Sequence, residues 1–429
     1  MRIENLSNKI DTAIRFFLYL LIFWLPYSSA VVESSVITAL LLWLIKRLWL
    51  WQKNKRAYSL IQALGPPPTP LNSVIFIFLV ICFLSALGSA FWEQAFRGLI
   101  CKTLEWFVIF WLVVEVFDQP KHIFWAIGIL LFTAASTAVD AILQFHVWGR
   151  DIFFTNPLIE GRATAGFSHP NKLGSFFTLT LPLALVGLFT PGLKRRMRFL
   201  MKVLCVLMLW SFILTFSRGA WAATVIGIAF FTGWIRQNLI PRLSVMALIL
   251  SILVGSLMIV YFSRPHISGQ VGQTEIQQTL RWRWTVWKGC WTMIKEKPFL
   301  GHGPNTFMPV FQEYRQSIPV SENPTYAHNS FLQMTAEVGI LGLAGLFFIL
   351  GRIFYLGIQV LDRNRSPSVE KTWILAGLCG VLSFLLHNFV DTDFYSLQVS
   401  ALFWLIVGLV ISLDKSLSKT ANYGIKNLH

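Results

Sequence analysis

Two arginines and one histidine occur where short polar motifs border long apolar segments. Arg218 lies in TFSRGAWAA, Arg283 lies in TLRWRWTVW, and His328 opens AHNSFLQMTAEVGILGL. A guanidinium binds phosphate oxygens through two parallel hydrogen bonds and stays charged at any working pH. An imidazole can take a proton near neutral pH. Together these side chains have the chemistry to hold a lipid-linked pyrophosphate as leaving group while the histidine activates an attacking hydroxyl.

No carboxylate cluster of the kind that holds Mg²⁺ accompanies these residues in the sequence. The arginines would therefore neutralise the leaving group themselves, by electrostatic stabilisation. We accordingly expect neither a metal ion nor an organic cofactor. The chemistry requires the three side chains to share one side of a membrane, so the elements that position them must be considered next.

The composition indicates a membrane protein. Of 429 residues, 55% are hydrophobic and 13% are charged, about half the charged share of soluble domains. Apolar runs recur that are long enough to cross a hydrocarbon core, which takes roughly 20 residues. We predict an all-α, polytopic membrane protein with about twelve transmembrane helices. The predicted spans are residues 14–30, 34–50, 71–89, 99–117, 122–145, 173–190, 199–216, 219–235, 243–262, 333–357, 373–390 and 394–412.

The positions of lysine and arginine predict the orientation. With both termini in the cytoplasm, the basic clusters KNKR, KRRMR and RNR all fall on the cytoplasmic side. This distribution explains the net charge of +16. A nucleic-acid-binding protein would instead gather its basic residues on one soluble domain, and the sequence contains none.

This topology divides the chain into four regions and leaves two sizeable segments outside the membrane. The regions are residues 1–262, which hold the first nine spans and a smaller periplasmic segment at 146–172; a long periplasmic loop at 263–332; residues 333–412, which hold the last three spans; and a cytoplasmic tail at 413–429. Arg218, Arg283 and His328 all then face the periplasm.

The long loop is predicted to carry an amphipathic helix. On a helical period, one face gathers Leu280, Trp284, Trp287, Trp291 and Ile294. Arg281, Lys288 and Lys295 recur every seven residues in a different sector, which is typical of a helix lying in the membrane interface. Arg283 lies at the edge of the apolar face, so we expect it to point toward the helix bundle. Arg281 is the alternative candidate, because the R-W-R pattern offers two arginines.

Three residues of the smaller periplasmic segment are weaker candidates. Arg162, His169 and Asn171 could line the path of a donor sugar. The motif HPN is equally compatible with a helix start, because the residue before proline avoids helical conformation.

Four further polar residues lie near the ends of predicted spans. Asp391 and Asp393 occupy an outside turn, where Asp391 could orient His328 or pair with an arginine, or where both could simply be solvated. Asn329 is predicted to cap the helix that follows it. Glu337 lies deeper along that helix, where we expect it to be buried and paired rather than catalytic.

Several of these motifs resemble the signature blocks of the O-antigen ligase/polymerase superfamily. The blocks are ATAGFSHPNKLGSFF, TFSRGAWAA, RWRWTVW followed by PFLGHGPNTF, AHNSFLQMTAEVGILGL and HNFVDTDF, which follow one another in the expected order from about residue 160 to residue 395. The resemblance implies a GT-C-like, metal-independent, inverting membrane glycosyltransferase of the bacterial inner membrane. Its donor would be a glycan linked to undecaprenyl pyrophosphate, used on the periplasmic side.

The resemblance also assigns roles to residues. It implies that Arg218 and Arg283 bind the pyrophosphate and that His328 activates the acceptor. In the ligase branch the acceptor is a sugar hydroxyl of lipid A–core. The sister polymerase branch joins repeat units that are both lipid-linked, and the motifs alone separate the two poorly. One long late loop, with a histidine opening the next span, favours the ligase.

A transporter or flippase for a lipid-linked sugar is the hypothesis from another class. The candidate residues gather on one face of the membrane, whereas a transporter is expected to show charges at the midplane and broken helices in paired half-repeats. The sequence therefore favours a transferase.

Overall fold

The computed structural model describes residues 2–53, 59–234, 273–314, 324–362 and 368–426. Within these residues the chain is α-helical and has no β-strand, which confirms the predicted fold class. The elements are α1 (Arg2–Trp24), α2 (Ser29–Lys53), α3 (Leu60–Leu64), α4 (Asn72–Leu87), α5 (Trp92–Gly98), the π-helical η1 (Leu99–Leu104), α6 (Glu105–Val116), α7 (Pro120–Leu143), the π-helical η2 (Gln144–Trp148), α8 (Pro170–Gly187), α9 (Arg195–Leu214), α10 (Arg218–Trp234), α12 (Gln273–Glu296), α13 (Phe307–Tyr314), α14 (Ser330–Asp362), α15 (Val369–His387), the 3₁₀ turn η4 (Asp393–Tyr395) and α16 (Leu397–Lys426).

Six of the described helical segments are long and apolar enough to cross a membrane, namely α2, α7 with η2, α9, α14, α15 and α16. The apolar helices α4 and α10 are shorter. The predicted spans 14–30, 99–117 and 173–190 also fall on helices, in α1, in η1 with α6, and in α8. The predicted span 243–262 lies outside the described residues. The structure is that of a multi-pass membrane protein.

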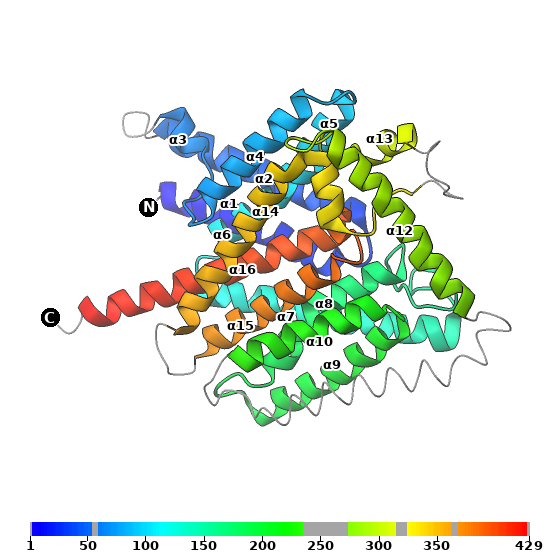
Figure 1. Cartoon of the computed structure of the whole chain (residues 1–429). Helices are drawn as coiled ribbons and strands as arrows, with labels where there is room; N and C mark the ends of the chain where they lie inside the picture. The colour runs from blue at the N-terminus through cyan, green and yellow to red at the C-terminus, as the bar shows by residue number, and fades with distance from the viewer. Residues whose placement is uncertain (1, 54–58, 235–272, 315–323, 363–367, 427–429) are drawn as a thin grey trace.

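Helix α8 occupies the centre of the bundle, packed against α15, α10, α9 and α7 (Figure 1). Nearly all of its residues are buried, so it needs no continuous lipid-facing apolar surface. Its hydroxyl side chains, including Ser175 and Thr178, donate to carbonyls of the same helix, at 2.9 and 2.7 Å. Small residues allow close packing around it: a Cβ on Gly380 of α15 would lie 2.6 Å from the Leu179 carbonyl oxygen.

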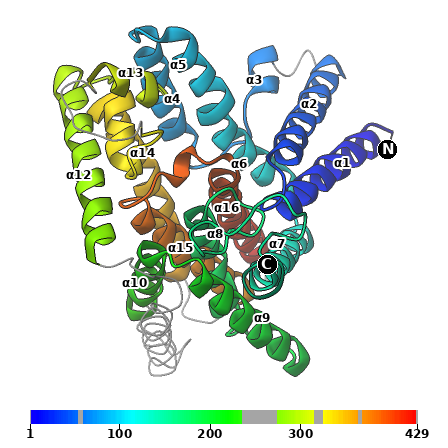
Figure 2. The same cartoon turned by 90° about the vertical axis from the view of Figure 1, so that its right-hand side faces the viewer.

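Both chain ends lie on one side of the molecule, and α12 runs along the opposite side (Figure 1). Figure 2 shows α12 beside α13 and α14 at the edge of the bundle. This arrangement brings the helix of the long loop over the ends of the helices that carry the candidate site.

The predicted helix of the long loop is present, but its buried face differs from the expected one. Val286, Cys290 and Met293 are fully buried toward α13 and α14, together with Ile294, which was expected there. Of the expected face, Trp287 is half-buried, whereas Trp284 and Trp291 are exposed; the side chain of Leu280 lies outside the described part. The smaller side chains fit against the neighbouring helices, and the two large indoles are left on the outer surface.

Helix α14 is broken at Gly339, whose φ and ψ are 71° and −178°. The break frees backbone groups inside a membrane-spanning helix, and these must find partners within the protein. They pair with the segment after α12: the Ile340 N–H donates to the Pro298 carbonyl at 2.8 Å, and the Glu337 carbonyl accepts from the Gly303 N–H at 2.7 Å. The first turns of α14 are thereby fixed to the end of α12.

Candidate active site

His328 lies two residues before Ser330, the first residue of α14. Its φ is 50°, a left-handed conformation that residues other than glycine adopt infrequently. The next residue, Asn329, accepts the backbone N–H groups of Phe331 and Leu332 at 3.1 and 3.0 Å, so the predicted helix cap is confirmed. The His328 ring packs edge to face on Trp282 of α12, with ring centroids 5.3 Å apart. The half-buried imidazole therefore sits between α12 and the start of α14.

Asp391 is the acidic partner of this histidine. Its Oδ1 lies 3.4 Å from Nδ1 of His328, longer than a close hydrogen bond, and the two side chains form an ion pair when the imidazole carries a proton. The carboxylate is buried, so the alternative of a solvated turn is wrong. Its position is fixed by backbone contacts, because Oδ1 also accepts the Thr392 N–H at 2.8 Å and the Asp391 carbonyl accepts the Ser330 N–H at 3.0 Å.

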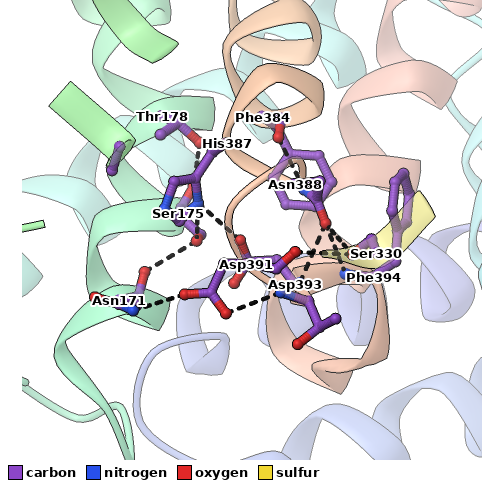
Figure 3. A network of polar contacts seen from close by, with 12 residues as sticks. Asn171, Ser175, Thr178, Ser330, Phe384, His387, Asn388, Asp391, Asp393 and Phe394 are labelled. Atoms are coloured by element: carbon purple, nitrogen blue, oxygen red, sulfur yellow. Dashed lines mark hydrogen bonds and ion pairs between the residues drawn. The ribbon is translucent and has the colours of Figure 1, made fainter. Parts of the chain in front are cut away.

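The second oxygen of Asp391 begins a chain of side chains, and its first bond, to Asn171, is seen in Figure 3. Asn171 donates to Asp391 Oδ2 at 2.7 Å, and Arg162 donates to Asn171 Oδ1 at 2.7 Å. The same arginine donates through Nε to the Thr215 carbonyl at 2.9 Å, in the turn just before Arg218. The segment 146–172 and the α9–α10 turn are thus tied to the acidic partner of the histidine.

Arg162 and Arg283 lie within electrostatic range of Asp391, and Arg218 lies within electrostatic range of both arginines. Burial lowers the pKa of Arg162 and of Arg283, and the attraction of Asp391 opposes this in both. The charge of Arg218 acts on both of these guanidinium groups, and the charge of Arg283 acts on Arg162. Because a guanidinium stays charged at any working pH, the structure concentrates positive charge there.

The electrostatics of Asp391 follow from its neighbours. Burial alone would raise the pKa of the Asp391 carboxyl, but the close approach of His328 and the charges of His387 and His328 outweigh burial. The pKa of Asp391 is therefore held well below its usual range, and the carboxylate stays ionised under ordinary conditions.

The two candidate arginines of α12 differ in their surroundings. Arg283 is half-buried and lies within electrostatic range of Asp391 and Arg218. Arg281 is exposed. Arg218 is itself exposed at the first position of α10, beside the α15–η4 turn, since a Cβ on Gly219 would lie 2.7 Å from Val390.

His169 is the N-cap of α8, which begins at Pro170, so the helix-start reading of HPN is confirmed. Its Nδ1 accepts the Asn171 N–H at 3.2 Å. Burial, with help from the charges of Arg162 and His328, lowers the pKa of His169, against the attraction of Asp391. A neutral imidazole is what this acceptor role requires.

A buried polar cluster next to this site was not predicted from the sequence (Figure 3). His387 Nδ1 lies 2.8 Å from Asp393 Oδ2 and 3.0 Å from Ser175 Oγ. Asn388 accepts the Asp393 N–H at 3.1 Å and the hydroxyl of Ser330. The cluster joins α8, α14 and α15 next to Asp391. The motif HNFVDTDF contains most of these residues, but its spacing does not reveal their partners.

Lys172 was also missed. It follows Asn171 at the start of α8, within electrostatic range of Asp391 and Asp393, and burial lowers the pKa of its ammonium group against their attraction. Its position adds a fourth basic side chain to this part of the molecule. A lysine two residues after a helix-start proline gave no signal of this in the sequence.

Glu337 is buried and paired, as predicted. Its carboxylate accepts the Asn305 and Phe307 N–H groups at 2.7 and 3.1 Å, and the amide of Gln333 at 3.2 Å. Among the described residues, no three histidine, cysteine, aspartate or glutamate side chains are grouped as potential metal ligands.

Comparisons with known proteins point to one family. A family model described as O-Antigen ligase matches residues 203–347, the part of the chain that contains Arg218, Arg283 and His328. The O-antigen ligase of Salmonella typhimurium strain LT2 is 24% identical over 369 residues, which covers 81% of this chain and 84% of that protein. These two comparisons confirm the resemblance to the O-antigen ligase family that the sequence motifs predicted.

Proposed function

We propose that the protein is an O-antigen ligase of the bacterial inner membrane. It transfers a glycan from undecaprenyl pyrophosphate to a sugar hydroxyl of lipid A–core on the periplasmic face. The observation that carries this proposal is the pair of His328 and Asp391, 3.4 Å apart, beside three arginines. An acid–base side chain next to concentrated positive charge suits the departure of a pyrophosphate.

His328 acts as the base in this mechanism. Asp391 faces Nδ1 and stabilises the imidazolium that forms, so Nε2 is the ring nitrogen that takes the proton of the acceptor hydroxyl. The hydroxyl oxygen forms a bond to the anomeric carbon of the glycan, and the bond from that carbon to the pyrophosphate oxygen breaks. Attack from the face opposite the leaving group inverts the anomeric configuration.

Arg218 and Arg283 receive the leaving undecaprenyl pyrophosphate. Their guanidinium groups form charge-assisted hydrogen bonds to phosphate oxygens and neutralise the charge that develops as the glycosidic bond breaks. The half-buried position of Arg283 near Asp391 supports its choice over the exposed Arg281. Arg162 contributes charge from a position fixed by Asn171 and by the Thr215 carbonyl.

The arrangement of the fold supports a periplasmic site. The chain ends and α12 lie on opposite sides of the molecule (Figure 1), as expected if the termini are cytoplasmic. Trp284 and Trp291 are exposed on α12, and tryptophan is enriched at the membrane interface. A lipid-linked donor and a lipid acceptor would both approach at this level.

The test is reconstitution of the purified protein with glycan-bearing undecaprenyl pyrophosphate and lipid A–core, without metal or nucleotide. We expect a glycan-bearing lipid A product that is lost in His328→Ala. Lengthened lipid-linked glycan with unmodified lipid A–core would make the protein a polymerase instead. Movement of the donor across the membrane without any new glycosidic bond would make it a transporter.

A further inference from the structure

The residue before His328 is held by two side chains from different helices. The carbonyl of Ala327 accepts the indole N–H of Trp287, from α12, at 2.9 Å. The N–H of Ala327 donates to Oε1 of Gln333, from α14, at 2.9 Å. Ala327 is fully buried, so both backbone groups need these partners. Neither Trp287 nor Gln333 has a role in the transfer chemistry described above.

The backbone conformation of His328 explains why the two hydrogen bonds to Ala327 matter. With φ at 50°, the histidine backbone occupies a region that persists in a non-glycine residue only when the surroundings fix it. A relaxed backbone at this position would swing the imidazole away from Asp391. The two bonds to Ala327 constrain the chain immediately before the strained residue, and the Asn329 cap constrains it immediately after.

A hydrogen bond to Glu337, one turn further along α14, orients the Gln333 amide. Its Nε2 donates to Oε1 of Glu337 at 3.2 Å, and this carboxylate also accepts the backbone N–H groups of Asn305 and Phe307. Both oxygens of this carboxylate accept N–H groups, so it presents acceptors toward Gln333. It therefore turns the amide NH₂ of Gln333 toward itself and leaves the amide oxygen facing the N–H of Ala327.

Trp287 connects the same peptide to the arginine helix. It lies four residues after Arg283 on α12, so the two side chains project from neighbouring positions on one side of the helix. A shift of α12 that moved Arg283 would also stretch the bond between Trp287 and Ala327. The carbonyl bond thus ties the position of the arginine to the backbone of His328.

We propose that Trp287 and Gln333 are positioning residues that hold the His328 imidazole against Asp391 and in register with Arg283. The inference rests on the proposed role of His328 in activating the acceptor. It adds two residues that touch neither substrate but set the geometry of the transfer.

Two substitutions remove the bonds; Gln333→Leu nearly preserves the volume of the side chain, whereas Trp287→Phe makes it smaller by one ring. Trp287→Phe removes the indole N–H, and Gln333→Leu removes the amide. We expect each to lower kcat by about 10-fold to 100-fold, because small displacements of a reacting group have effects of that size. The KM for the lipid-linked donor should change less than kcat. The double variant should lose less than the product of the single losses, because both act on one peptide.

The matched controls are Trp291→Phe on the exposed side of α12 and Gln359→Leu at a partly exposed position in the far part of α14, both expected to keep normal kcat. Activity in Trp287→Phe and Gln333→Leu equal to that of the controls would overturn the proposal. Equal losses in kcat, in donor affinity and in thermal stability would also overturn it, since they would indicate a merely structural role.

Exchanging the residue types of Gln333 and Glu337 tests the orientation of the Gln333 amide directly. Gln333→Glu alone places two carboxylates face to face and should lower kcat. Gln333→Glu combined with Glu337→Gln restores an amide donor opposite a carboxylate acceptor and keeps the acceptor for Ala327. The Phe307 N–H, which donates to the same Glu337 oxygen as Gln333, loses that acceptor in the double variant, so the matched comparison is with Glu337→Gln alone. We expect the double variant to be more active than either single variant. A double variant less active than both would contradict the proposal that Glu337 orients Gln333 toward Ala327.

A measurement without substrates separates this inference from the proposed function. If the reconstituted wild-type protein forms no glycan-bearing lipid A, the proposed function fails. Hydrogen exchange at the Ala327 amide and the rate of His328 modification by diethyl pyrocarbonate then still test the positioning. Faster exchange in Gln333→Leu, with altered His328 modification in both variants but not in the controls, supports it. Unchanged exchange and unchanged modification would overturn it.

Discussion

His328 and Asp391 approach one another from opposite ends of two different helices, with Nδ1 and Oδ1 3.4 Å apart. The histidine precedes α14, and the aspartate follows α15. Their meeting depends on the bond from the Ser330 N–H to the Asp391 carbonyl at 3.0 Å, which joins the two helix ends. The relative position of His328 and Asp391 is therefore as rigid as the junction of the two helices. Substitutions at these residues can be tested for effects on the chemical step separately from effects on substrate binding.

Asp391→Asn should impair the chemical step more than donor binding. The substitution preserves the shape of the side chain but removes the charge that stabilises a protonated His328. Because proton transfer by a positioned group contributes about 10²–10⁴-fold to a rate, we expect kcat to fall by about 10²-fold or more, with a smaller change in donor KM. Steady-state transfer to lipid A–core measures both. Wild-type kcat in Asp391→Asn would exclude a role for the carboxylate in activating the histidine.

The same carboxylate should make stability depend on acid pH. The pKa of Asp391 is lowered in the folded protein, so its contribution to stability is fully present above the unfolded pKa of about 3.9. That contribution is lost as the pH falls below this value toward the folded pKa. Thermal unfolding in detergent, measured from about pH 6 to about pH 3, should show a steeper acid loss in wild type than in Asp391→Asn. If the melting temperatures of wild type and Asp391→Asn fell in parallel as the pH is lowered, the expected contribution of Asp391 would be contradicted.

Arg283→Ala should weaken donor use far more than Arg281→Ala. A hydrogen bond to a charged group is worth about 1.5–3 kcal/mol, which corresponds to roughly 10-fold to 150-fold in affinity. We expect a loss of this size in donor affinity for Arg283→Ala. Arg281 is exposed on the same helix, so its replacement is the matched control and should change donor affinity less than about threefold. The reverse order would assign pyrophosphate binding to Arg281.

Asn171→Leu should uncouple the α9–α10 turn from the acidic partner of the histidine. Asn171 joins Arg162 to Asp391 through two bonds of 2.7 Å, and a buried polar group left without its partner costs about 1–3 kcal/mol. We expect a lower melting temperature and lower transfer activity. Ser168→Ala, at an exposed position just before α8, removes only the 2.9 Å bond from the Lys172 ammonium group and should leave both close to wild type. Unchanged activity in Asn171→Leu would separate this chain of bonds from catalysis.

Local chemistry made the helices and their starts predictable. The apolar runs indicated the bundle, Asn329 the cap of α14, and HPN the beginning of α8. These features depend on neighbours in the sequence, and the structure confirms each of them.

Long-range pairing set the limits of prediction. Periodicity located an apolar face on α12, but which side is buried depends on α13 and α14, so the exposure of Trp284 and Trp291 was not foreseen. The bond between His387 and Asp393 could not be inferred either. Both residues occur in a noticed motif, yet neither residue type nor spacing shows that the 3₁₀ turn folds back beneath α15.

Gly339→Ala should damage the protein far more than another glycine substitution in the same helix. At φ 71° and ψ −178°, the backbone lies in a region that is essentially restricted to glycine, and an added Cβ would overlap the Phe299 carbonyl oxygen. Strain and overpacking together should cost about 2–5 kcal/mol. A Cβ added to Gly351, further along α14, would meet no atom within 4 Å, so Gly351→Ala should be neutral or stabilise by up to about 1 kcal/mol. Thermal unfolding of both purified variants measures the difference. Equal stability of Gly339→Ala and Gly351→Ala would mean that the break at Gly339 and its contacts with the segment after α12 are not required for folding. The placement of His328 would then need another explanation.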